Sequence, residues 1–142
     1  RTYAVGEISE VARRLMRVTG DALEAGIRAC RRGNRLGDVS NSIQRTVEAG
    51  GFSVVVQFVG HGIGKEMHEE PQIPNFGPAG RGPVLEAGMT FALEPMVNEG
   101  SYEVEVDEED GWTVRTVDGT LSAHFEHTVA VTEEGPVILT MP

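Results

Sequence analysis

The hydrophobic pattern of this chain changes its period once, at Gly50-Gly51, and this change constrains the fold more than any other feature. Before the glycine pair, apolar residues recur at steps of three and four, which predicts helices over residues 9–32 and 36–49. After it, apolar and polar residues alternate, which predicts strands over 52–59, 89–94, 102–106, 112–117 and 123–131. We therefore expect an α/β (α+β) protein in which two helices are followed by a mostly antiparallel sheet.

Local signals mark the ends of these elements. Ser9 is a good cap for the first helix, and Gly33-Asn34 is a good stop. Asp110-Gly111 and Asp118-Gly119 favour hairpin turns. Residues 74–88 are rich in proline and glycine and are expected to form a surface loop.

The start of the chain resembles the end of a strand. Residues 2–5 have strand character, and Gly6 ends it. A strand needs a partner and a beginning, so we expect the chain to start inside a larger folded unit.

Charge and composition exclude several classes of function. The 142 residues fit one domain at most, and 12 Lys+Arg against 22 Asp+Glu give a net charge of -10, which disfavours nucleic acid as a ligand. No apolar run approaches the length of a membrane span. Cys30 is the only cysteine and cannot form an internal disulfide, so a reducing, cytoplasmic setting is expected. Six of the eight residues 103–110 are acidic, but their alternation with valines favours a solvated strand edge over a calcium loop.

Histidines gather in the second part of the chain, where they can act as metal ligands. His61, His68, His124 and His127 all follow the predicted helices. Neutral imidazole is a common ligand of first-row divalent ions. His61 lies in the sequence GHGIG, where three glycines are expected to let the backbone turn sharply and leave the imidazole uncrowded.

Two carboxylates strengthen this interpretation. Glu94 closes an otherwise uncharged strand just before Pro95, and Glu126 shares a strand face with His124. A carboxylate at the end of an apolar strand needs a partner charge. One possibility is a separate salt bridge from each glutamate to a surface arginine. The other is convergence with an imidazole into an oxygen-rich site suited to Mn, Fe, Co or Zn.

The motifs in combination resemble a known family. They are, in chain order, GHGIG (60–64), MHEEP (67–71), GMTFALEPMVNEG (88–100), DGWT (110–113) and SAHFEHTVAVT (122–132). From about residue 3 to residue 140 the chain resembles type I methionine aminopeptidase, a metallopeptidase of the pita-bread (creatinase/aminopeptidase-like) fold. The resemblance implies that residues 1–142 are the C-terminal part of a single catalytic domain. They would form one half of a pseudo-symmetric fold, with helices packed outside a curved antiparallel sheet, whose N-terminal half is absent.

The same resemblance implies a metal centre. His61, Glu94 and Glu126 match three ligands of a centre that holds two divalent metal ions (Mn, Fe, Co or Zn). His124, which neighbours them, is a candidate for a supporting contact to these ligands. The family's two aspartate ligands and a further histidine belong to the half that is absent here.

Residues for substrate and catalysis can be assigned in the same way. His68 matches a catalytic histidine that contacts the scissile amide of the substrate, and Met67 and Trp112 match positions lining the pocket for the methionine side chain. Without the resemblance, Trp112 reads as a core aromatic after a turn.

The implied reaction is metal-dependent hydrolytic removal of the N-terminal methionine from nascent polypeptides. Because two ligands are absent, the chain alone is expected to be inactive or weakly active and to need the N-terminal half or a second chain. The alternatives are an Xaa-Pro aminopeptidase or dipeptidase of the same fold, and a non-catalytic half-domain that binds peptides or partners. The strings EPMVN (94–98) and EHT (126–128) look more like the methionine-specific branch.

Overall fold

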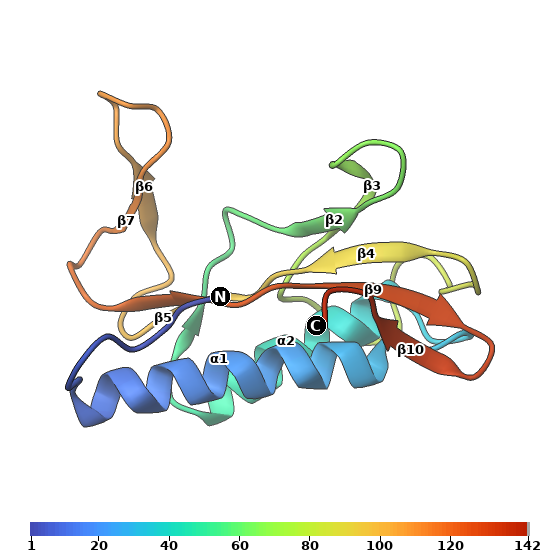
Figure 1. Cartoon of the computed structure of the whole chain (residues 1–142), viewed down its shortest axis with the longest axis horizontal. Helices are drawn as coiled ribbons and strands as arrows, with labels where there is room; N and C mark the ends of the chain where they lie inside the picture. Colours follow the sequence, from blue (N-terminus) through green and yellow to red (C-terminus); the bar gives the residue numbers. More distant parts are fainter. Residues whose placement is uncertain (142) are drawn as a thin grey trace.

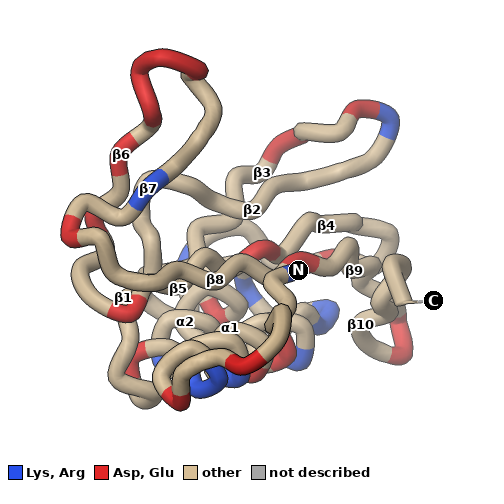
Figure 2. The backbone as a smooth tube through the Cα atoms, turned by 60° about the vertical axis from the view of Figure 1, so that its left-hand side comes forward, with Lys and Arg blue, Asp and Glu red and all other residues tan. Residues whose placement is uncertain are grey.

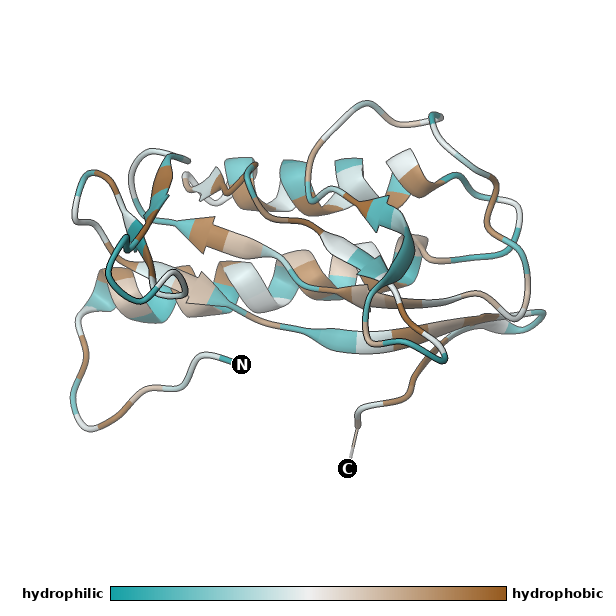
Figure 3. Ribbon diagram, turned by 90° about the horizontal axis from the view of Figure 1, so that it is seen from above, coloured by the Kyte–Doolittle hydropathy of each residue, from teal (hydrophilic) through white to brown (hydrophobic). Residues whose placement is uncertain are grey.

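The protein consists of two helices packed against one side of a set of antiparallel strands. The computed structural model describes residues 1–141. Helices α1 (Glu10–Ala29) and α2 (Leu36–Ala49) lie side by side beneath the strands (Figure 1, Figure 3). In the described residues, neither helix has the length and apolar character needed to cross a membrane.

The strands form three antiparallel sheets. The largest has the order β10-β9-β4-β2-β3, the second has the order β1-β5-β8, and β6-β7 is a separate hairpin that rises away from the body of the molecule (Figure 1). The strands are β1 (Ser53–Val54), β2 (Gly60–Gly62), β3 (Glu69–Ile73), β4 (Thr90–Leu93), β5 (Met96–Asn98), β6 (Val104–Val106), β7 (Val114–Thr116), β8 (Ser122–His124), β9 (His127–Thr132) and β10 (Gly135–Ile138). The predicted fold class, two helices followed by a mostly antiparallel sheet, is confirmed.

Two stretches of chain pass between the two larger sheets side by side. Glu94-Pro95 connects β4 to β5, and Phe125-Glu126 connects β8 to β9 in the opposite direction. The predicted continuous strand over 123–131 is therefore wrong, because the chain changes sheets in its middle. The Phe125 N–H donates to the carbonyl of Pro95 at 3.4 Å and holds the two connections together.

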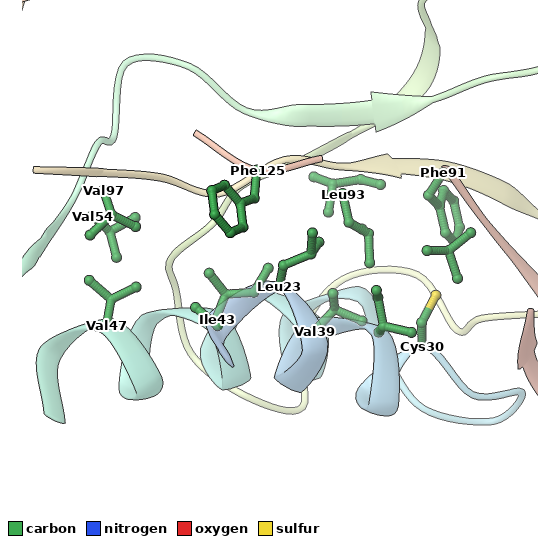
Figure 4. Close-up of a cluster of buried hydrophobic side chains, with 14 of the residues drawn as sticks. Leu23, Cys30, Val39, Ile43, Val47, Val54, Phe91, Leu93, Val97 and Phe125 are labelled. Atoms are coloured by element: carbon green, nitrogen blue, oxygen red, sulfur yellow. The ribbon is translucent and has the colours of Figure 1, made fainter. Parts of the chain in front are cut away.

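The core lies between the helices and the strands. The predicted apolar face of α2 is buried, and side chains of both helices point up to meet those of the strands (Figure 4). The helices approach closely at Gly26, where an added Cβ would lie 2.8 Å from the side chain of Ile43. Phe125, at the change of sheets, packs down toward Gly20 of α1. The crossing point is thus fixed from below by the core.

The helix boundaries follow the sequence closely. The second helix is confirmed at 36–49, and the first ends slightly early, at Ala29. The Ser9 side chain accepts a hydrogen bond from the N–H of Ala12 at 3.2 Å, which confirms the predicted cap.

The strands follow the sequence less well. The predicted strand 52–59 is reduced to β1, and the short strands β2, β3, β5 and β10 were not anticipated. Asp110-Gly111 lies at the tip of the β6–β7 hairpin as predicted. Asp118-Gly119 does not form a hairpin turn, because β7 and β8, which it joins, pair with different strands. The region 74–88 is a loop apart from an isolated bridge between Val84 and Arg35.

The first residues do not form a strand, contrary to expectation, but they extend the edge of β8. The Thr2 N–H donates to the carbonyl of His124 at 3.0 Å, and the His124 N–H donates to the Thr2 hydroxyl at 3.0 Å. This segment therefore holds the backbone of His124 in place from the side opposite β5.

Charge is distributed unevenly over these elements. Acidic residues gather at the tip of the β6–β7 hairpin, whereas eight of the twelve basic residues lie on the two helices or in the turn between them (Figure 2). At the hairpin tip, hydrogen bonds from Thr113, and then from Trp112, lower the pKa of Asp110 to about 2. The Asp110 carboxylate therefore helps to form the turn. This agrees with the prediction that residues 103–110 belong to a solvated strand edge and not to a calcium loop.

Candidate metal centre

His61 is held in an inner strand of the largest sheet by glycines that permit close strand packing. Strand β2 lies between β4 and β3, and an added Cβ would overlap the carbonyl oxygen of Ala92 at Gly60 and that of Glu70 at Gly62. Neither glycine has a positive φ. The expectation that these glycines allow a sharp turn is thus wrong for this pair: they let neighbouring backbones approach.

The orientation of the His61 ring leaves one nitrogen free for a ligand. Its Nδ1 lies 2.8 Å from the carbonyl oxygen of Gly62, which can only accept a hydrogen bond. Nδ1 therefore carries a proton, and Nε2 is the ring nitrogen left for a ligand. This nitrogen faces the Glu94 carboxylate, with Nε2 3.4 Å from Oε1. A metal-binding histidine is commonly fixed in this way through its second nitrogen.

Glu94 lies between two imidazoles. Its side chain is only 15% exposed, and its second oxygen, Oε2, lies 3.3 Å from Nε2 of His124. Among the described residues no lysine or arginine pairs with this carboxylate, so the predicted alternative of an arginine salt bridge is wrong for Glu94. The buried Asn75 side chain donates to the Glu94 carbonyl at 3.3 Å and fixes the backbone there.

Register explains why a second carboxylate meets Glu94. Leu93 pairs with His127 across β4 and β9, and Met96 pairs with His124 across β5 and β8. The same register places Glu94 opposite Glu126. Within residues 1–141, Glu94, His124 and Glu126 form the one group of three whose ligand atoms all lie within 4.8 Å of one another.

The donor set fits a divalent metal ion. Two carboxylates opposite each other repel. A divalent cation between them would offset that repulsion and find nitrogen and oxygen ligands of the kind that Mn, Fe, Co and Zn accept. The residues present are therefore suited to a metal centre of this kind.

A cleft of about 650 Å³ opens over these side chains. His68 lines it with its ring centroid 4.3 Å from that of His61. Trp112 lines it from the tip of the β6–β7 hairpin and is 86% exposed, so the interpretation as a core aromatic is wrong. Met67 is 71% exposed and is not among the side chains that line the cleft.

Several residues at the site were not singled out from the sequence. Asn75, which fixes the Glu94 backbone, lies in the proline- and glycine-rich loop, where its near-complete burial has no local signal. Lining residues from the segment after β1 and from β7 become neighbours only in the folded chain; they include Val55, Gln57, Phe58, Val59 and Arg115.

Comparison with known proteins defines the class of protein to which this fold and site belong. Residues 1–133 match metallopeptidase family M24, and the chain belongs to that family. Dependence on a divalent metal, implied by the family, agrees with the donor set of Glu94, His124 and Glu126.

Within this family, the chain is similar to methionine aminopeptidases, as its motifs predicted. It is 58% identical over 141 residues to the methionine aminopeptidase of Clostridium perfringens, which covers 99% of this chain and 56% of that protein. The crystal structure of methionine aminopeptidase from Thermotoga maritima superposes with a TM-score of 0.96 at 56% identity, over 99% of this chain and 56% of that one. The dipeptidase PepE of Mycobacterium ulcerans is less similar, with a TM-score of 0.76 at 28% identity over 100% of this chain and 33% of that one. The chain thus spans about half the length of the curated relatives it matches.

Proposed function

We propose that this chain is the part of a methionine aminopeptidase that carries three ligands of its metal centre, and that it takes part in removing the N-terminal methionine from nascent polypeptides in the cytoplasm. The observation that carries the proposal is the position of Glu94 between His61 and His124 and opposite Glu126, in a family of metallopeptidases. The high identity to methionine aminopeptidases supports this substrate class over Xaa-Pro peptides.

His61, Glu94 and Glu126 would hold the ions in this proposal, with two divalent ions, Mn, Fe, Co or Zn, in the complete centre. When bound, such ions supply Lewis-acid activation of a water and of the substrate carbonyl. His61 is suited to this role because its Nδ1 is tied to Gly62, which directs Nε2 to the centre. Each carboxylate oxygen of Glu94 faces one imidazole, so Glu94 could bind an ion through one oxygen or through both.

His68 is proposed to act on the substrate. Its ring borders both His61 and the cleft, so a peptide bond placed at the centre comes within reach of an imidazole that is not committed to the carboxylates. A hydrogen bond donated by His68 to the carbonyl of the scissile amide would stabilise the negative charge that develops there.

The walls of the cleft suit a methionine side chain. Trp112 closes it from the hairpin, and Val55, Phe58 and Val59 add apolar surface. A flexible thioether packs favourably against an aromatic ring. Met67 is proposed as an additional contact, made when a substrate is bound.

The centre is proposed to be completed by residues outside 1–142. On this proposal, residues 1–142 are the C-terminal part of a single catalytic domain, and the remaining ligands, two aspartates, come from an N-terminal half or a second chain. Large apolar side chains exposed at the ends of the described region, including Tyr3, Val5 and Leu139, support a partner there.

The test is peptide hydrolysis by the longest protein that contains this chain. With Co²⁺ or Mn²⁺ present, release of free methionine from Met-Ala-Ser is expected, with no comparable cleavage of a panel of Xaa-Pro peptides. Glu94→Gln should abolish turnover, whereas Glu134→Gln, a matched change in the turn between β9 and β10, should preserve it. Faster cleavage of the Xaa-Pro panel, or normal turnover by Glu94→Gln, would contradict the proposal.

A further inference from the structure

His124 lies in one cluster with Glu94 and Glu126, although it is not one of the three expected ligands. It ends strand β8, and its ring is 45% exposed toward the cleft. Its Nε2 lies 3.3 Å from Glu94 Oε2, and His124 belongs to the close group with Glu126. The half-exposed ring thus lies beside two carboxylates at the edge of the cleft.

The two oxygens of Glu94 face different histidines. Oε1 is directed at His61 and Oε2 at His124. The strand registers explain this arrangement, because His61 pairs with Ala92, two residues before Glu94, and His124 lies two residues before Glu126, which is opposite Glu94. Diagonal neighbours of this kind lie on one face of a sheet and within reach of long side chains. One carboxylate therefore has an imidazole on each side.

The backbone of His124 is held from both sides. It pairs with Met96 of β5, and on the other side it exchanges hydrogen bonds with Thr2. A ligand attached to a strand fixed in this way loses little freedom when an ion binds. By contrast, Nδ1 of His127 is 2.8 Å from the hydroxyl of Thr140, outside the cluster.

We propose that His124 is itself a metal ligand. Together with Glu94 and Glu126 it would hold a divalent ion. The inference rests on the proposed metal centre and deepens it, because it adds a second imidazole to the expected ligands. An added nitrogen ligand favours Co²⁺ and Zn²⁺ over Mg²⁺ and Ca²⁺.

The experiment uses Co²⁺ alone as the probe and the longest protein that contains this chain. In proton NMR of a Co²⁺-loaded protein, each coordinated imidazole that keeps an N–H gives a strongly shifted, exchangeable resonance. Two such resonances are expected, from His61 and His124. His124→Gln should lose one of them and weaken Co²⁺ binding by about tenfold or more. His127→Gln, the same change three residues away, should keep both.

Circular dichroism melts of all three proteins establish that each is folded when the spectra are recorded. A spectrum of His124→Gln that keeps both resonances, with Co²⁺ affinity unchanged, would overturn the role of His124 and leave the metal centre intact. If His124→Gln does not fold, His124→Ala together with a Glu126→Gln variant supplies the same comparison. No shifted resonance in the folded parent chain would overturn this inference and the proposed metal centre together.

Discussion

Glu94 and Glu126 face each other across a gap in two paired strands, at the point where both strands change sheets. The pairs on either side of the gap, Leu93 with His127 and Met96 with His124, keep one register. Like charges placed opposite each other destabilise a sheet. The fold therefore holds two carboxylates in an arrangement that a bound cation would relieve.

This arrangement predicts opposite effects of Glu126→Gln on stability and on binding. Without metal, the variant should be more stable than the parent by about 0.2–1 kcal/mol, because the repulsion with Glu94 is removed. With Co²⁺, the order should reverse, since the parent gains more from binding. Thermal melts in EDTA and in Co²⁺ check both halves, with Glu134→Gln as the control. A variant less stable than its parent in EDTA would contradict this account of the gap.

Close packing around His61 predicts that Gly62→Ala is harmful although Gly62 has no side chain that could bind an ion. The new methyl would overlap the carbonyl of Glu70 in β3, so β2 must move and His61 with it. Overpacking of this kind costs about 1–3 kcal/mol. We expect a lower melting temperature and weaker Co²⁺ binding by the folded fraction. Gly80→Ala, where no atom lies within 4 Å but φ is +72°, is the control for backbone strain alone. Unchanged binding by Gly62→Ala would contradict the packing argument.

The thiol of Cys30 is predicted to be unreactive in the folded chain. It is fully buried, and burial raises its pKa from 9.0 to about 12. Above pH 9 the unfolded chain loses this proton and the folded chain keeps it, so stability should fall as pH rises from 9 toward about 12. A thiol reagent such as DTNB should react slowly at pH 8 until denaturant is added, and Cys30→Ser should remove this thiol's contribution to the alkaline loss. Rapid labelling under native conditions would contradict it.

Trp112 is predicted to report on occupation of the cleft. It is the only tryptophan and is largely exposed, so its emission should resemble that of indole in water. Methionine added to the Co²⁺-loaded chain should shift that emission to the blue as its side chain packs on the ring. Glycine, which binds through the same amine and carboxylate but has no side chain, should not. Equal responses to methionine and glycine would contradict the prediction that the methionine side chain packs on Trp112.

The sequence predicted the helices better than the strands for a physical reason. The face of α2 repeats over four turns, so Leu36, Val39, Ile43 and Val47 identify it together. Strands such as β2 and β5 have only three residues each, too few to show a period of two. Their pairing depends on distant segments, which composition does not reveal.

The residues of the candidate site could likewise be predicted only in part. Glu94 and Glu126 could be named from local sequence because a carboxylate beside apolar strand residues needs a partner. His61 was chosen among the four histidines only through the resemblance of the motifs to methionine aminopeptidases. That Glu94 would lie between two histidines could not be predicted from local sequence, because it depends on the common register of β4–β9 and β5–β8 across the change of sheets. Asn75 was missed for the same reason, since only the folded loop brings it to the Glu94 carbonyl.

The most direct test of the metal centre is calorimetric titration of Co²⁺ into the folded chain and into Glu94→Gln. The account predicts saturable binding of at least one ion by the parent chain. Loss of the carboxylate between His61 and His124 should weaken that binding by about tenfold or more. Glu134→Gln should bind as the parent does. Identical isotherms for the parent and Glu94→Gln, or no binding by a parent chain that circular dichroism finds folded, would contradict the account.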